Sequence, residues 1–296
     1  VGNPMELSTK PVAYYKIGDK ATFNGSEYLV TNAASEVYSP YALDFDGTND
    51  EIEFSTFVGS GEFTLSLWVK PTALNNNQNV LGFGSSGSNW INTSSTTLIR
   101  VKMKSGSPLN FVESGGNNLV LNAWNHILIY RDSSNDIGVF VNGATFGSTI
   151  NNSLDINLKT IGRGTSTKFF EGVISNFSIW NAALTSTQVT ELYNQGKPSN
   201  LNNHSAYSSL VSWWQLGENS SFDGTNWTVL DEKGTNNGTS VNMGEGATVN
   251  GVGTSANGLS DGMGGADNII GDAPYSTGNA VSYGMGVDAK STDVPS

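Results

Sequence analysis

The sequence has no cysteine and only two histidines, His126 and His204. The absence of cysteine excludes disulfide bonds, thiolate metal sites and cysteine nucleophiles. Two histidines are too few for a histidine-based zinc site, and they make a Ser-His-Asp triad difficult to assign. No stretch approaches the roughly 18 apolar residues of a membrane span, and residues 1–10 have neither the basic nor the apolar region of a signal peptide. We therefore expect no disulfide framework and no membrane insertion.

Charged residues are also scarce, at 14% against about 25% in an average globular protein. Acids outnumber bases, 26 to 14, so the net charge is −12. A surface of that sign repels phosphate backbones, which predicts no nucleic-acid partner. Glycine, asparagine and serine are abundant instead, and these residues weaken helix interiors. The composition favours short strands joined by turns.

Short alternating runs confirm that preference along the chain. Phe63–Pro71 alternates apolar and polar residues, and two further runs, 127–130 and 137–141, are joined by a turn-rich segment. Asn142-Gly143 follows the second run and is a strong hairpin signal. We predict further strands at 98–103, 157–161 and 172–180. Many short strands at this spacing indicate an all-β sandwich or barrel.

One segment has the pattern of a helix. Thr185 and Gln188 fit a capping box, Val189, Leu192 and Tyr193 form an apolar face, and a glycine and a proline follow. We predict a short helix that covers part of the sandwich.

The sequence also contains an internal repeat. A shift of 199 residues aligns 12–19 (VAYYKIGD) with 211–218 (VSWWQLGE) and pairs Phe23 with Phe222 and Tyr28 with Trp227. No copy of residues 43–197 follows, so the repeat covers only an opening strand motif. We expect the second copy to pack onto the sandwich or onto a neighbouring subunit, because it has no strands of its own to cover its apolar residues.

The C-terminal region changes in composition. Residues 244–265 are rich in glycine, and the later residues contain scattered aromatic and aliphatic side chains without periodicity. Such a segment buries too little apolar surface to fold alone. We predict three parts: a sandwich over 1–200, an incomplete repeat over 201–243, and an extended arm over 244–296 that contacts other copies or a larger particle.

Residues 10–197 resemble the laminin G-like, concanavalin A-like family. The resemblance rests on five signatures in order, namely 12–19, 42–53, 63–71, the central hairpin 124–143, and the closing strand and helix 170–193. It implies a jelly-roll β-sandwich of two antiparallel sheets with one short helix. The family includes lectins, adhesins, glucanases and spacers, so the fold alone does not fix an activity.

Calcium is the candidate ion. Asp44, Asp46, Asn49 and Asp50 surround Gly47 and offer several oxygen ligands in one turn. The alternative is that these side chains form the turn by hydrogen bonds to the backbone. Ser175 stands where many family members have aspartate, which weakens the calcium hypothesis.

Carbohydrate binding needs an exposed aromatic side chain flanked by amides and carboxylates. We predict Trp90 with Asn92, and Tyr130 with Asp132, as the best loop positions for a glycan. Glucanases of this fold use the pattern Glu-x-Asp-x-Glu on one strand, because alternate residues share a face. The nearest stretch, Asn49–Glu53, lacks the first acid, so we predict no catalytic residues and no enzyme activity.

Three functions remain, in this order. The first is a non-enzymatic structural or display protein, a decoration or fibre subunit, since the composition and the extended tail resemble proteins of phage virions. The second is an extracellular glycan-binding or adhesion module. The third is a glycoside hydrolase. All three predict a location outside the cell or on a virion surface.

Overall fold

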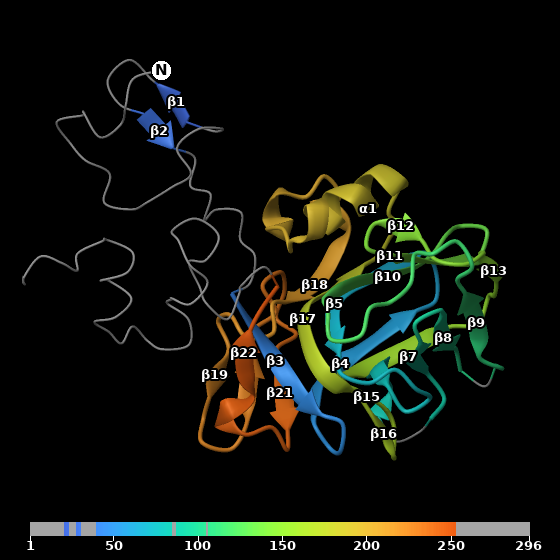
Figure 1. Ribbon diagram of the computed structural model, residues 1–296, viewed down its shortest axis with the longest axis horizontal. Helices are drawn as coiled ribbons and strands as arrows, with labels where there is room; N and C mark the ends of the chain where they lie inside the picture. The colour runs from blue at the N-terminus through green and yellow to red at the C-terminus, as the bar shows by residue number, and fades with distance from the viewer. Residues whose placement is uncertain (1–20, 24–27, 31–39, 85–86, 105, 253–296) are drawn as a thin grey trace, which may run out of the picture. The chain divides into compact units, whose positions relative to one another are not determined.

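The computed structural model describes residues 21–23, 28–30, 40–84, 87–104 and 106–252 (Figure 1). The chain divides into two compact units, one formed by residues 38–253 and the other by 1–37 with 254–296. In the second unit the structure describes one hairpin, β1 (Ala21–Phe23) with β2 (Tyr28–Val30). Most of the predicted arm, residues 253–296, and the first repeat motif, 12–19, lie outside the described residues.

The unit 38–253 is a β-sandwich of two large antiparallel sheets, which confirms the predicted fold class (Figure 1). The first sheet has the path β12-β11-β10-β5-β17-β3-β22, with β13 beside β11 and β18 beside β17. Its strands are β3 (Tyr41–Asp46), β5 (Phe63–Pro71), β10 (Asn125–Arg131), β11 (Asp136–Val141), β12 (Ala144–Thr145), β13 (Ile150–Asn151), β17 (Glu171–Trp180), β18 (Leu210–Trp214) and β22 (Thr248–Asn250).

The second sheet has the order β19-β20-β21-β4-β14-β6-β7-β8-β9. These strands are β4 (Glu51–Gly59), β6 (Asn79–Gly82), β7 (Trp90–Ser95), β8 (Leu98–Lys102), β9 (Leu109–Val112), β14 (Ile156–Ile161), β19 (Ser221–Phe222), β20 (Trp227–Val229) and β21 (Gly238–Val241). A small hairpin, β15 (Arg163–Thr165) with β16 (Lys168–Phe169), packs against β6 and β7.

The core lies between the sheets because each strand turns its alternate residues inward. Leu65, Leu67 and Val69 of β5 are fully buried together, as their spacing predicts. The predicted hairpin also forms. β10 pairs with β11, with Ile127 opposite Val141. β11 then pairs with β12 across the Asn142-Gly143 turn, which has positive φ at both residues, as a type I′ turn requires.

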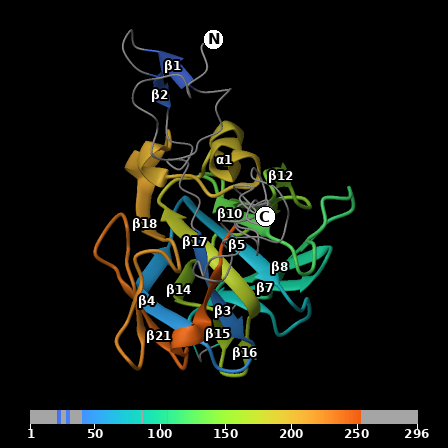
Figure 2. The same ribbon diagram turned by 60° about the vertical axis from the view of Figure 1, so that its left-hand side comes forward.

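The predicted helix is α1 (Ser186–Tyr193), and its capping box is present: the Thr185 side chain accepts the Gln188 N–H, and the Gln188 side chain accepts the Thr185 N–H. Figure 2 shows α1 near β10 and β12 of the first sheet. Its Val189 and Leu192 pack with Leu128 and Trp180 on the outer face of that sheet. Short 3₁₀ turns follow: η4 (Asn194–Gly196), η5 (Leu201–Asn203), η6 (Tyr207–Ser209) and, later, η7 (Glu245–Ala247).

Residues beyond 200 extend both sheets. β18 pairs with β17 and β21 pairs with β4, so the second copy of the repeat packs onto the sandwich of its own chain. β22, inside the segment predicted as an arm, pairs with β3. The predicted boundaries at 200 and 243 stay predictions, but the strands on either side of them belong to the same two sheets.

Candidate functional site

The outer face of the second sheet presents a row of polar side chains across β7, β8 and β9. Asn92, Arg100 and Asn110 lie directly opposite one another in the strand register. The residues between them on these strands, Ile91, Ile99, Val101 and Phe111, are fully buried in the core. Alternation therefore turns the polar residues away from the core, on the face that α1 does not cover.

Arg100 is at the centre of this row. Its guanidinium carbon lies 5.3 Å from the ring centroid of Trp90, so the cation rests on the indole. Its Nε donates to Asn110 Oδ1 at 3.2 Å, and a terminal nitrogen donates to Asn76 Oδ1 at 3.3 Å. These contacts hold the guanidinium in place while Asn76 and Asn110 remain exposed. We call Asn76, Trp90, Asn92, Arg100 and Asn110 the Arg100 row.

The Arg100 row has hydrogen-bonding groups that face outward. Within the described chain, no hydrogen bond involves the side-chain nitrogen of Asn76 or of Asn110. The backbone carbonyl of Asn76 also accepts a hydrogen bond from Lys168 Nζ at 2.9 Å. Amides and a guanidinium in fixed positions can bind adjacent hydroxyls or a carboxylate of a ligand.

The electrostatics of this face differ from those of the whole chain. Arg100, Lys102 and Lys168 form no ion pair with a carboxylate among the described residues, although the net charge of the chain is −12. In contrast, Lys159 pairs with Glu53 at 3.4 Å, and Arg163 pairs with Glu51. The Arg100 row therefore favours an anionic ligand.

Two of the four predicted glycan residues, Trp90 and Asn92, belong to this row. Their predicted position in a loop is wrong, because both are on β7 and their side chains are 9% and 1% exposed. Both are on the outer face but are covered there, because Arg100 lies over Trp90 and the Asn92 side-chain nitrogen donates to the Asn75 carbonyl at 3.5 Å. Trp90 supports Arg100 from below, and Asn92 accepts from the Ser94 hydroxyl.

The other two, Tyr130 and Asp132, lie at one end of the first sheet. Tyr130 packs on Phe140 at 5.8 Å, and burial raises the pKa of its phenol. Asp132 accepts the N–H groups of Ser134 and Asp136, both at 2.9 Å, and so fixes the turn between β10 and β11. The structure thus places the two predicted pairs on different sheets.

Of the four candidate calcium ligands, Asp46, Asn49 and Asp50 lie at the turn between β3 and β4, and Asp44 lies within β3 opposite Val173. Asp46 Oδ1 accepts the N–H groups of Thr48 at 2.7 Å and Asn49 at 3.1 Å, and Asp50 Oδ2 accepts that of Asp46 at 3.0 Å. Burial raises the pKa of Asp44, and it raises that of Asp50 to about 6. Among the described residues, no three or more His, Cys, Asp or Glu side chains are grouped so that they could hold a metal. Calcium at this turn stays a prediction.

The acidic strand that a glucanase would use is neutralised by bases. Glu51 is buried beside Arg163, and the exposed Glu53 faces Lys159. Desolvation raises the pKa of Glu51 despite the arginine. Glu51 and Glu53 therefore each form an ion pair with a base of the same protein, Arg163 and Lys159.

A serine–histidine contact occurs inside the protein, under α1. Ser66 Oγ lies 2.7 Å from His126 Nε2, and the His126 ring packs against Trp68 at 4.8 Å and Tyr193 at 5.9 Å between ring centroids. His126 is fully buried, which lowers its pKa to about 3, and its Nδ1 has no hydrogen-bond partner in the described part of the chain. A catalytic histidine needs an orienting group at Nδ1 and access to substrate. This contact is therefore structural.

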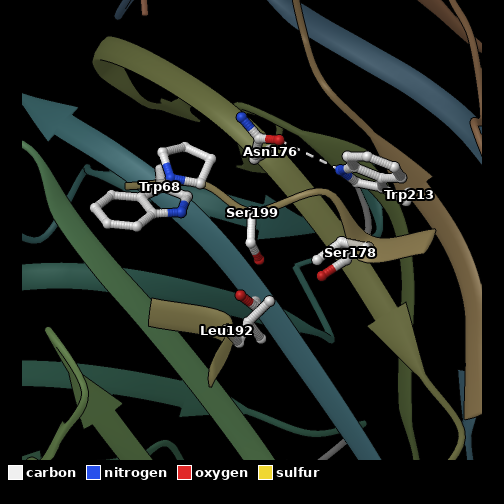
Figure 3. Close-up of a pocket in the computed structure, with 9 residues that line it drawn as sticks. Trp68, Asn176, Ser178, Leu192, Ser199 and Trp213 are labelled. Carbon is white, nitrogen blue, oxygen red and sulfur yellow. Dashed lines mark hydrogen bonds between the residues drawn. The ribbon is translucent and has the colours of Figure 1, made fainter. Parts of the chain in front are cut away.

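Beside it is a small cavity lined by Trp68, Asn176, Ser178, Leu192, Ser199 and Trp213, among others (Figure 3). Its volume of about 10 Å³ is enough for one water molecule at most. Trp213 Nε1 donates to Asn176 Oδ1 at 3.3 Å across it. The cavity is too small for a sugar or a cofactor.

A larger hollow of about 380 Å³ lies between the end of β9 and the segment after β12. Glu113 in its wall accepts backbone N–H groups from Gly115 and Gly147, which lowers the pKa of its carboxyl. Asn117 donates to three carbonyls, the nearest that of Val141 at 2.9 Å. The polar side chains here hold loops together, whereas Asn76 and Asn110 of the Arg100 row are exposed.

Three residues of the row, Asn76, Arg100 and Asn110, were missed in the sequence. For two of them a signal existed: in Leu98–Lys102 and Leu109–Val112 the polar residues alternate with buried ones. The position of Asn76 depends on a loop, and no periodicity indicates where a loop residue lies.

The described chain is thus a lectin-like β-sandwich with a basic, amide-rich face. Residues 46–190 match the family model of the concanavalin A-like lectin/glucanases superfamily. No curated protein matches the sequence. Within the described residues, no helix is long and apolar enough to span a bilayer.

Several solved structures are similar to this chain. A protein of Bacteroides ovatus ATCC 8483 that is described as a carbohydrate binding protein is 18% identical and shares the fold with a TM-score of 0.54. The match covers 72% of this chain and 60% of that one. A heptameric pentraxin of Limulus polyphemus is 14% identical over 72% of this chain and 95% of its own, with a TM-score of 0.45. Domain 4 of an arabinanase of Geobacillus stearothermophilus, solved with arabinotriose, is 22% identical over 51% and 76%, with a TM-score of 0.40.

Proposed function

We propose that this protein is a non-catalytic glycan-binding module of an extracellular surface, and that it binds an acidic glycan at the Arg100 row. The observation that supports the proposal is the position of Arg100, held on Trp90 between two exposed amides. A guanidinium fixed in this way can bind a carboxylate with two parallel hydrogen bonds. The asparagine amides beside it suit the neighbouring hydroxyls of a sugar.

The experiment compares Arg100→Ala with the wild type on acidic and neutral oligosaccharides. Loss of one charge-assisted contact predicts about a 10- to 100-fold weaker affinity for the acidic glycan. Lys233→Ala is the matched control, because Lys233 is also a cation over an aromatic ring, that of Tyr207 at 3.4 Å, and lies outside the row. Equal affinities for all three proteins would contradict the proposed site.

A second candidate function is surface display as a structural subunit, such as a decoration or fibre protein of a virion. The feature that favours it is the repeated strand motif, which exceeds what one sandwich needs. The number of copies in the native particle or surface layer tests it. A protein isolated only as a free monomer would count against this role.

A further inference from the structure

Arg100 shares Asn76 with a second cation, Lys168. A terminal nitrogen of Arg100 donates to the side-chain oxygen of Asn76 at 3.3 Å, and Lys168 Nζ donates to its backbone carbonyl at 2.9 Å. Covalent geometry keeps the two oxygens of one residue a few ångströms apart, so the two donor nitrogens lie within about 11 Å of each other. Asn76 thus brings a guanidinium and an ammonium together on one surface.

The two cations reach Asn76 from different elements. Arg100 belongs to β8, whereas Lys168 belongs to the hairpin of β15 and β16, which packs against β6. β7 lies between β6 and β8, and neighbouring strands are about 4.8 Å apart, so the two side chains start roughly 10 Å from each other across the sheet. Each cation has its own acceptor on Asn76, and two acidic groups of a ligand match this arrangement better than one.

The hairpin holds Lys168 in a defined position. Its first strand lies so close to β6 that a Cβ on Gly164 would be 2.7 Å from the Cβ of Asn79, a clash that glycine avoids. On the same strand Arg163 forms an ion pair with the buried Glu51 of β4. The hairpin is therefore fixed to the second sheet at two points, and Lys168 is placed by it rather than by a free loop.

Both cations have hydrogen-bond donors left for a ligand. The ammonium of Lys168 has three N–H groups and the guanidinium of Arg100 has five, and among the described residues they use one and two of these. All three acceptors are neutral amide oxygens of Asn76 and Asn110. Within the described chain neither cation forms an ion pair with a carboxylate. Their charge is available to an acidic ligand.

We propose that Lys168 is a second cationic group of the binding site, and that the ligand is a linear glycan with carboxylates on neighbouring sugars. Arg100 binds one carboxylate and Lys168 binds the next. The exposed amide nitrogen of Asn76, beside both cations, donates to a hydroxyl of the same sugars. This inference rests on the proposed function, because it names the ligand class of the same site. A glycan with a single acid uses Arg100 alone and binds more weakly.

The test compares two forms of one tetrasaccharide of galacturonic acid, with affinities measured by calorimetry on the full chain. In the first form all carboxylates are free, and in the second one carboxylate is free and the others are methyl esters. The wild type should bind the fully acidic form about 5- to 20-fold more tightly, because that form makes one more charge-assisted contact.

Three variants divide the effect between the cations. Lys168→Ala should remove the preference for the fully acidic form and leave the affinity for the singly acidic form unchanged, whereas Lys168→Arg should keep the preference. Arg100→Ala should weaken the binding of both forms. Lys102→Ala is the matched control, because Lys102 lies two residues from Arg100 on the same face of β8, and no hydrogen bond in the described chain joins it to Asn76. It should weaken both forms equally, by less than about threefold.

Two results would overturn the inference and leave the proposed function intact. Equal losses for both forms in Lys168→Ala would mean that Lys168 only fixes the position of Asn76. A preference for the fully acidic form that Lys102→Ala reduces as much as Lys168→Ala does would mean that net charge, and not a second binding group, causes it.

Other results concern the ligand class and the site itself. A wild type that binds the two forms equally, or binds neither, would contradict a ligand with carboxylates on neighbouring sugars. A tetranucleotide of thymidine bound as tightly as the fully acidic tetrasaccharide would also contradict it, because the site would then take a phosphate chain. If Arg100→Ala changed neither affinity, the proposed function and this inference would fail together.

Discussion

Asp50 is a carboxyl group placed where ionisation opposes folding. Its side chain is 7% exposed, and burial raises its pKa from 3.8 to about 6. A raised acid pKa means that the native state binds the proton more tightly than the unfolded chain does. The free energy of unfolding therefore decreases as pH rises from about 4 to 6, and the loss is complete above pH 6.

The first prediction follows from this decrease of stability with rising pH. Asp50→Asn should raise the free energy of unfolding by about 1–2 kcal/mol at pH 7–8 and leave it unchanged near pH 4. Asp223→Asn is the control, because backbone N–H groups lower the pKa of Asp223 and its effect should have the opposite sign. Urea titrations across pH measure both. Equal free energies of unfolding of Asp50→Asn and the wild type at pH 8 would contradict the raised pKa of Asp50.

The same variant tests calcium at the turn between β3 and β4. If Asp50 binds the ion, the wild type gains thermal stability with added calcium and Asp50→Asn loses that gain. If the carboxylates only form the turn, calcium changes neither melting temperature. The hydrogen bonds of Asp46 to Thr48 and Asn49 form in either case.

Residue patterns in the sequence predicted the buried face of β5 and the hairpin at Asn142-Gly143, because both depend on neighbours in the chain. They did not predict that Arg131 would be fully buried. Its guanidinium donates to the carbonyls of Gly59, Gly61 and Leu154 at 2.7–2.8 Å and packs on Phe63. These three carbonyls belong to residues far from Arg131 in the sequence, so they leave no local signal. For the same reason the partner of Arg100, Asn76, could not be found from the sequence.

At the scale of single elements, α1 depends on its first turn. Eight residues are too few for a stable isolated helix, so its cap and its packing on the first sheet must supply the stability. The side chain of Thr185 satisfies the Gln188 N–H, and Gln188 returns the bond to the Thr185 N–H. The sequence was sufficient here because the capping box is a local pattern.

The element-scale prediction is that Thr185→Ala costs about 1 kcal/mol and lowers the melting temperature by roughly 2–4 °C. Thr190→Ala removes the same atoms from the exposed interior of α1, where alanine is the better helix former, and should be neutral or slightly stabilising. Thermal melts followed by tryptophan fluorescence compare the two. Similar losses in both variants would mean that the cap contributes nothing beyond the side chain itself.

At the scale of the whole molecule, the sandwich is completed by segments far beyond the region that matches the family. β22 pairs with β3 at the edge of the first sheet, and Trp227 Nε1 donates to the Gly244 carbonyl at 2.9 Å. Val252, near the end of the described chain, is 2% exposed. Glycine-rich composition predicted an extended arm from 244, and it could not indicate that β3 offers an edge for this segment. Pairing between residues more than 200 positions apart has no signature in either partner alone.

The last prediction separates the two parts of the C-terminal region. A chain that ends at residue 243 loses β22 and exposes the edge of β3. It also leaves the indole N–H of Trp227 without its acceptor, the Gly244 carbonyl. It should unfold at a lower temperature, by roughly 4–10 °C for a loss of about 2–3 kcal/mol. A chain that ends at 252 keeps these contacts and is the matched control, with a melting temperature close to that of the full chain. Both truncations lack 253–296, so any partner contact made by those residues is lost equally. Equal melting temperatures for the two chains would show that β22 adds nothing to the sandwich, and that 244–252 belongs with the arm.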